Sequence, residues 1–292
     1  MQDQINSFSA QLSLIYPVPV PIREDQLRDF QNNGFVTVKG LFSKEEVSSI
    51  SEASERVVSE GWAPTEHYGR TFRSWRAITT QSEELAGVAC DPRMVTVAMQ
   101  CLGARIKLVG SQLIHRLTLD GTETSRTPNA PGWHRDVFGM DRDLGGESPL
   151  CAVKATVWLS SATKVENGAT LFVAGSQKDR KLPEIPSGKA DPKTFSRTQP
   201  DIGDVTFFEN RVAHAGGYNV SPQTLKFALF QYGYRWLQPV AGQYHSAGLL
   251  DLCSDFCREL LQPIELDENN CYRPENRLPS LENWFESSRI VK

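Results

Sequence analysis

The chain has 292 residues, of which 39% are hydrophobic and 23% are charged, and its formal net charge is −4. This composition is typical of a soluble globular protein, and the slight negative charge favours neither nucleic acid nor an anionic membrane as a partner. The sequence contains no run of about 18 apolar residues that would cross a bilayer. The first 22 residues lack the basic start of a secretory signal, and the six cysteines show no CxxC spacing. We therefore expect a cytoplasmic protein with reduced thiols.

Helical patterns dominate the first third of the chain. Residues 23–33 have the spacing of an amphipathic helix that ends before a glycine, and residues 35–38 form a short strand rich in β-branched side chains. Ser43 and Glu46 have the spacing of a capping box, which predicts the start of a second helix. A third helix is predicted at 92–101, with an aspartate before it and a proline at its first position.

The periodicity of the hydrophobic residues changes after residue 105. Apolar and polar residues then alternate, as they do in strands, in the segments 105–119, 151–162, 169–176, 204–210 and 224–237. Turns rich in Gly, Asn, Pro and Asp separate these segments, which favours an antiparallel sandwich or jelly roll. One further helix is predicted within 248–262. Since no repeat or linker divides the chain, we expect one domain over 1–292, with a helical part at about 24–102, a jelly-roll core at about 105–240, and a C-terminal helix and loops at 241–292.

Three residues are candidates for a metal site. His134 and Asp136 follow a Pro-Gly turn in the segment PGWHRDVFG, and His214 ends a predicted strand before two glycines. Taken singly, an HxD pair or a histidine on a strand is more often an ordinary polar residue than a ligand. Together they would supply two imidazoles and one carboxylate on one face of an octahedral ion, which suits Fe(II) and leaves three positions open. Zinc more often takes a fourth protein ligand.

Four segments resemble the phytanoyl-CoA dioxygenase-like family of Fe(II)/2-oxoglutarate oxygenases. They are FQNNGFVTVKGLFSKEEV, similar to the family's opening segment; GWHRD, similar to its metal-binding turn; VENGATLFVAGSQK, similar to its Asn-Gly and strand; and VAHAGGYNVSPQTLKFALFQYGYRW, similar to its distal-histidine strand pair. They cover about residues 30 to 236 in the family's order. The resemblance implies a mainly β fold with flanking α-helices and a double-stranded β-helix (jelly-roll) core. It also implies Fe(II) held by His134, Asp136 and His214 as the catalytic centre, with 2-oxoglutarate and O2 as cosubstrates.

The chain departs from the family's pattern at two places. AGSQ, residues 174–177, replaces a PGSH-like turn whose histidine is not an iron ligand in the family. Leu225 replaces the arginine that usually lies about eleven residues beyond the distal histidine and pairs with the far carboxylate of 2-oxoglutarate. Lys226 is the adjacent base, and we expect it to bind that carboxylate, although neighbouring strand residues point to opposite faces and the register would have to differ by one.

Other residues are candidates for the cosubstrate pocket. Arg116 falls where the family often has a basic residue, and Gln112 shares its strand face. Thr170 could add a hydroxyl donor, and Arg73 lies in the basic segment RTFRSWRA. We expect Arg116 or Thr170 to assist Lys226. Arg76, in the same basic segment, is expected to be solvated surface charge.

Trp75 and Phe138 are the candidates for substrate contact, although aromatic residues at such positions more often belong to the core. Asp136 fills the place that halogenating relatives leave for chloride, so we expect hydroxylation or a related oxidation, with release of succinate and CO2. The sequence identifies neither the oligomeric state nor the small-molecule substrate. A natural product, an amino acid derivative, a phosphonate or phosphorus oxyacid, and an acyl group all stay open.

Two alternatives belong to other classes. One is a cupin-type metalloenzyme or zinc hydrolase that does not use 2-oxoglutarate, and the missing arginine at position 225 is its best support. The other is a metal-binding jelly-roll protein without turnover. Succinate formation coupled to O2 uptake separates both from the oxygenase.

Overall fold

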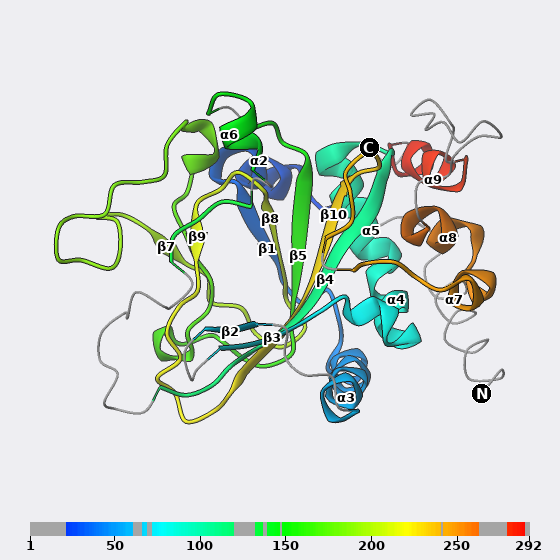
Figure 1. Cartoon of the computed structure of the whole chain (residues 1–292), viewed down its shortest axis with the longest axis horizontal. Coiled ribbons are helices and arrows are strands. Elements are labelled where there is room, and N and C mark those ends of the chain that lie inside the picture. Colours follow the sequence, from blue (N-terminus) through cyan, green and yellow to red (C-terminus); the bar gives the residue numbers. More distant parts are fainter. Residues whose placement is uncertain are drawn as a thin grey trace.

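Two antiparallel sheets and a set of helices make up the part of the protein that the computed structural model describes (Figure 1). The described residues are 22–60, 66–68, 72–119, 132–136, 139–146, 148–240, 242–262 and 279–289. The large sheet lies in the middle of the molecule, with the small sheet on one side of it and α4, α5, α7, α8 and α9 on the other. The prediction of a mainly β fold with flanking helices is confirmed.

Seven strands form the large sheet, in the order β1-β8-β5-β10-β4-β3-β2. Their bounds are β1 Phe35–Val38, β2 Glu66–Tyr68, β3 Phe72–Arg76, β4 Ile106–Arg116, β5 Ala152–Trp158, β8 Val205–Glu209 and β10 Leu225–Tyr234. The small sheet has the order β7-β6-β9, with β6 Leu171–Phe172, β7 Ser196–Arg197 and β9 His214–Ala215. The strands predicted after residue 105 therefore correspond to β4, β5, β6, β8 and β10.

All but one of the α-helices in the described ranges lie before residue 103 or after residue 246, and α6 lies between them. They are α2 Glu24–Asn33, α3 Lys44–Ser59, α4 Glu83–Ala89, α5 Pro92–Leu102, α6 Met140–Asp143, α7 Ala247–Leu252, α8 Asp255–Leu261 and α9 Pro279–Arg289, with 3-10 turns at Ile78–Thr80, Val165–Asn167 and Ser176–Lys178. The predicted capping box is present, since the Ser43 hydroxyl accepts from the Glu46 amide and the Glu46 carboxylate accepts from the Ser43 amide. Gly34 ends α2 with φ of 84°, in the left-handed region that favours glycine.

The two faces of the large sheet carry separate hydrophobic clusters, and alternation along β10 shows the division. Ala228, Phe230 and Tyr232 belong to the cluster shared with the helices, so we call this the helix-side face. Phe227 and Leu229 belong to the second cluster, together with residues of β6 and β8 such as Phe172 and Phe208; we call this the inner face, because it packs toward the small sheet. The inner face is the one that carries the candidate site.

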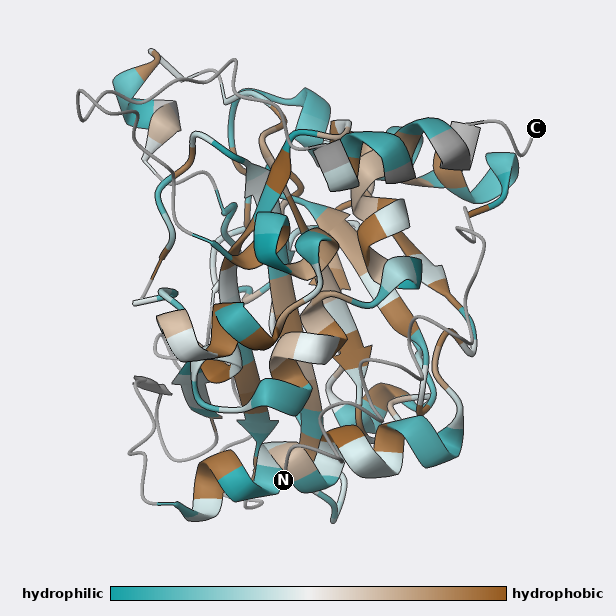
Figure 2. Ribbon diagram, turned by 90° about the vertical axis from the view of Figure 1, so that its right-hand side faces the viewer, coloured by the Kyte–Doolittle hydropathy of each residue, from teal (hydrophilic) through white to brown (hydrophobic). Residues whose placement is uncertain are grey.

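Figure 2 views the protein from the helix side, where hydrophobic segments colour the strands behind the helices brown. The helices supply matching apolar side chains to this cluster, such as Val47 and Ile50 from α3 and Met94 and Ala98 from α5. None of the helices in the described ranges has the length and apolar composition that a bilayer span requires.

Candidate metal centre

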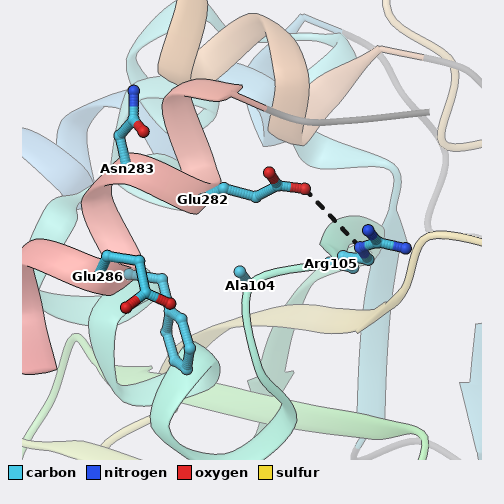
Figure 3. Close-up of a pocket in the computed structure, with 6 residues that line it drawn as sticks. Ala104, Arg105, Glu282, Asn283 and Glu286 are labelled. Atoms are coloured by element: carbon cyan, nitrogen blue, oxygen red, sulfur yellow. Dashed lines mark ion pairs between the residues drawn. The ribbon is translucent and has the colours of Figure 1, made fainter. Parts of the chain in front are cut away.

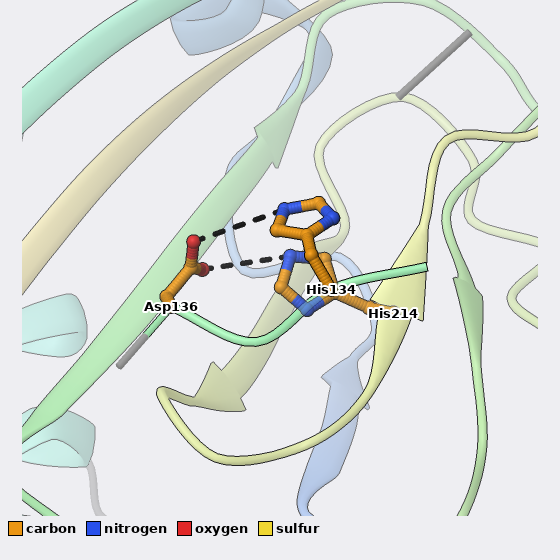
Figure 4. Close-up of side chains that lie close together, drawn as sticks. All are labelled: His134, Asp136 and His214. Carbon is orange, nitrogen blue, oxygen red and sulfur yellow. Dashed lines mark ion pairs between the residues drawn. The ribbon is translucent and has the colours of Figure 1, made fainter. Parts of the chain in front are cut away.

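The side chains of His134, Asp136 and His214 converge at one point beside the large sheet (Figure 4). One ligand atom from each lies within 4.8 Å of the others. The Nε2 atom of His214 is 3.5 Å from Asp136 Oδ2, and the Nε2 atom of His134 is 3.9 Å from Asp136 Oδ1. The structure thus brings His214 to the pair His134 and Asp136, although the two histidines are 80 positions apart in the sequence.

Backbone hydrogen bonds create this convergence. His134 and His214 form a β-bridge in which each amide donates to the other's carbonyl over 3.0 Å. The amide of Asp136 donates to the carbonyl of Asn210 over 2.9 Å, which ties the metal turn to the segment between β8 and β9. The positions of all three side chains therefore follow from main-chain pairing and do not depend on a bound ion.

Each imidazole is oriented by its second nitrogen. The Nδ1 atom of His134 lies 2.7 Å from the carbonyl of Gly132, and that of His214 lies 3.0 Å from the carbonyl of Val212. Because a carbonyl can only accept, Nδ1 is the protonated nitrogen in both rings, and in the neutral form of each ring the lone pair lies on Nε2. This is the arrangement in which histidine binds a metal through Nε2 while an outer partner fixes the ring.

The electrostatic setting favours the same protonation states. Burial lowers the pKa of His214 to about 3, and the neighbouring His134 acts in the same direction. Burial alone would raise the pKa of Asp136, but the Lys154 ammonium and the two imidazoles outweigh it and hold that pKa well below its usual range. A neutral imidazole beside an ionised carboxylate is the donor set that a divalent cation requires, so these residues fit Fe(II).

The surroundings of the triad differ on its two sides. The ring of His214 packs against Phe208 and Phe172, at centroid distances of 4.9 Å and 6.0 Å. Asp136 instead forms an ion pair of 2.7 Å with Lys154, whose side chain comes from the inner face of β5. One side of the centre is therefore dry and aromatic, and the other is charged.

The strand register places Lys226, the residue expected to bind the cosubstrate, on the helix side of the sheet. Leu225 belongs to the cluster on the inner face, so Lys226, the next residue along β10, points to the helix side. There its ammonium forms an ion pair of 2.6 Å with Glu55 of α3. The structure does not bring Lys226 to the triad.

Arg116 occupies the place across the sheet from Leu225. The two residues are Cα partners in the β4–β10 pair, and the buried Arg116 guanidinium lies 5.1 Å from the ring centroid of Phe227. Its Nη1 donates to the carbonyl of Gly168, in the Asn-Gly turn before β6. Thr170, also buried, follows two residues later.

The remaining candidates are divided between the two faces. Gln112 pairs with Leu229 and lies on the inner face, where it donates to Ser74. Arg73 pairs with His115 on β4, which places it on the same face as Lys226 and away from the triad. Trp75, predicted to contact the substrate, is only 5% exposed and packs in the helix-side cluster, so the structure does not bring it to the triad. Phe138 lies outside the described residues.

Several residues beside the triad were not predicted. Lys154 and Gln231 are polar residues within mainly apolar strands, and they are Cα partners on β5 and β10. A buried charge needs a partner. The lone lysine in the apolar segment AVKATVW was therefore the sequence signal that could have indicated a charged residue at the site. Arg76, expected at the surface, instead lies on the inner face opposite Gln112 and lines a cavity with Asp136.

Comparison with known proteins agrees with this architecture. Residues 30–227 match the family model described as phytanoyl-CoA dioxygenase. A curated ectoine dioxygenase of Bordetella parapertussis is 25% identical over 227 residues, which are 68% of this chain and 71% of that protein.

Two solved structures share the fold. The crystal structure of HygX from Streptomyces hygroscopicus with nickel and 2-oxoglutarate bound aligns with a TM-score of 0.60 at 20% identity, over 78% of this chain and 94% of that one. The non-heme alpha ketoglutarate dependent carbocyclase SnoK, from nogalamycin biosynthesis, aligns with a TM-score of 0.58 at 17% identity, over 84% and 94%. The predicted jelly-roll class is confirmed.

Proposed function

The chain belongs to the phytanoyl-CoA dioxygenase family of 2-oxoglutarate-dependent dioxygenases, which use Fe(II) and O2, and we propose that it hydroxylates a small-molecule substrate with release of succinate and CO2. In this proposal His134, Asp136 and His214 hold the iron. The observation that carries it is the convergence of their three ligand atoms within 4.8 Å, with the Nδ1 atom of each imidazole bonded to a carbonyl so that Nε2 is the nitrogen left for a metal.

The protein's own residues have separate tasks in this reaction. When bound, Fe(II) with 2-oxoglutarate and O2 supplies the oxidising power that inserts one oxygen atom into a C–H bond. The backbone bridge between His134 and His214 sets the ligand geometry before any ion arrives. Phe172 and Phe208 exclude water from one side of His214, and Lys154 keeps the carboxylate of Asp136 ionised and in place.

Arg116 is our proposed partner for the far carboxylate of 2-oxoglutarate, in place of Lys226. Its guanidinium is buried on the inner face, opposite the position where the family usually has arginine. A planar guanidinium can hold a carboxylate through two parallel hydrogen bonds, which a lysine cannot do. The main support for a metalloenzyme without 2-oxoglutarate was the leucine at 225, and a base on the facing strand removes that support.

The test is coupled turnover. Purified protein supplied with Fe(II), 2-oxoglutarate and O2 should form succinate in step with O2 uptake when a substrate is present, and mass spectrometry should show a product heavier by one oxygen atom. Ectoine, named for the curated relatives, is the first compound to try. Succinate formation that does not require Fe(II), or that is unchanged in Asp136→Ala, would contradict the proposal.

A further inference from the structure

A cavity of about 290 Å³ opens beside the metal centre, on the charged side of Asp136. Its walls come from β3, β4, β5, β10 and the metal turn. The polar side chains that line it include Arg76, Gln112, Arg135, Lys154 and Gln231, together with Asp136 itself.

The lining is strongly positive. Three cationic side chains face one carboxylate, and that carboxylate is the proposed iron ligand. Lys154 forms an ion pair of 2.7 Å with Asp136, but an ammonium has three N–H groups, so others are available to a second acceptor. Arg135 donates through one nitrogen to the carbonyls of Ser176 and Lys181, contacts that orient its guanidinium without removing its charge.

A second cavity does not share this charge. That cavity, of about 350 Å³, lies between α9 and the turn before β4 (Figure 3). Glu282 and Glu286 line it with a single base, Arg105, whose Nε is 3.7 Å from Glu282. The cavity that adjoins the triad thus differs in charge from this second cavity.

Gln231 supplies an independent sign of a ligand. Its side chain is only 7% exposed, and its Nε2 has no hydrogen-bond partner among the described residues. Gln231 is the Cα partner of Lys154 on the neighbouring strand β5 and of Gly110 on the neighbouring strand β4. A Cβ at Gly110 would lie 3.4 Å from Gln231 Oε1 and 2.8 Å from Val240, so the missing side chain leaves space for the amide. A buried N–H without an acceptor is costly, and a ligand with oxygen atoms would satisfy it.

The cavity and the proposed cosubstrate position are separated along β10. Leu225, which faces Arg116, and Gln231 are separated by six residues along the strand, or about 20 Å at 3.3–3.4 Å per residue. A five-carbon diacid bound by Arg116 is much shorter than this distance. The cavity is therefore available to a second molecule.

We propose that this cavity binds an oxyanion group of the substrate, a carboxylate or a phosphate, through Lys154 and Gln231, with Arg76 and Arg135 adding positive charge. The proposal rests on the proposed function and names the class of substrate on which the enzyme acts: small acids. The acidic group then lies next to Asp136, and the carbon to be oxidised belongs to the same small molecule.

The test uses the full chain with Fe(II) and 2-oxoglutarate under anaerobic conditions, so that no turnover occurs. The visible charge-transfer band of the iron chelate is recorded first. Inorganic phosphate and propionate are then titrated separately into the same sample by calorimetry, whether or not the band forms. A missing band counts against the proposed function, whereas the titration reports on the cavity alone.

Four proteins are compared: the parent, Lys154→Met, Gln231→Leu, and Lys226→Met as the matched control, which removes a lysine from the opposite face of β10. We expect one of the two anions to bind the parent and the control equally, and to bind Lys154→Met and Gln231→Leu at least about tenfold more weakly. The anion that binds the parent more tightly identifies the acidic group. Because Gln231 is not a partner of Asp136, its variant tests the cavity even if Lys154→Met disturbs the metal.

No binding of either anion to the parent would overturn the proposal. Equal affinity in all four proteins would also overturn it, because the anion would then bind elsewhere.

Discussion

Arg116 and Leu225 are Cα partners across β4 and β10, and their side chains share the inner face of the large sheet. Under the proposed function, a base on the adjacent strand takes the place of the base that the family usually carries at position 225. Because directly opposed residues in an antiparallel pair have their Cβ atoms about 5 Å apart, the positive charge stays in the same part of the inner face although the residue that carries it has changed.

The first prediction concerns Arg116 and Lys226. Arg116→Leu should raise the 2-oxoglutarate concentration needed for half-maximal turnover by about tenfold or more, since a hydrogen bond to a charged group is worth about 1.5–3 kcal/mol. Lys226→Leu should leave that concentration unchanged, because its ammonium pairs with Glu55 on the helix side. The reverse outcome, with Lys226 sensitive and Arg116 not, would return the role to the lysine.

A second prediction concerns Gly168, whose carbonyl accepts from Arg116. It has φ of +78°, and a Cβ there would lie 2.4 Å from the backbone carbon of Tyr218. Gly168→Ala should therefore lower the free energy of unfolding by about 2 kcal/mol or more, measured by urea denaturation. Gly188→Ala is the matched control: its φ is +72° but nothing lies within 4 Å, so only the backbone strain of about 1 kcal/mol is expected. Equal losses in the two variants would show that the close approach at Gly168 does not matter.

A third prediction concerns acid stability. Burial lowers the pKa of His115 to about 4, the nearby Lys226 adds to this, and Glu55 opposes it. Between pH 6.5 and 4 the unfolded chain binds a proton at this residue that the folded protein does not, so stability falls as the pH falls through this window. His115→Gln should remove about 2–3 kcal/mol of that loss. The free energy of unfolding is measured at pH 7 and pH 4.5, and a pH dependence identical to that of the parent would contradict the assignment.

Much of the strand pattern and the identity of the triad could be read from the sequence, because alternation marks β4, β5, β8 and β10 and because HxD and the distal histidine keep the family's order. The face on which each residue lies could not be read in the same way. β10 is apolar on both faces, as Leu225, Ala228 and Leu229 show, so periodicity does not tell which face points inward. For this reason the sequence alone could not show that Lys226, expected to bind 2-oxoglutarate, points to the helix side.

The placement of Trp75 and Arg76, in the basic segment RTFRSWRA, was hard to predict for a related reason. Residues 72–76 form β3, an inner strand of the large sheet that the sequence analysis did not predict, because charged and aromatic residues conceal its alternation. Once the strand is recognised, Trp75 and Arg76 point to opposite faces. Trp75 joins the helix-side core and Arg76 lines the cavity, whereas Trp75 was a candidate for substrate contact and Arg76 was expected at the surface. The register between β3 and β4 decides which face each side chain takes, and that register depends on a partner strand that is distant in the sequence.

The most direct test of the account is metal-dependent binding of 2-oxoglutarate by the triad. Under anaerobic conditions, Fe(II) and 2-oxoglutarate should give the parent protein the weak visible charge-transfer band of an iron chelate. His134→Ala, Asp136→Ala and His214→Ala should each lose the band while keeping a cooperative unfolding transition, and His115→Gln should keep the band as the histidine control. A band of undiminished intensity in the three triad variants would contradict the account, since the iron would then be held by other residues.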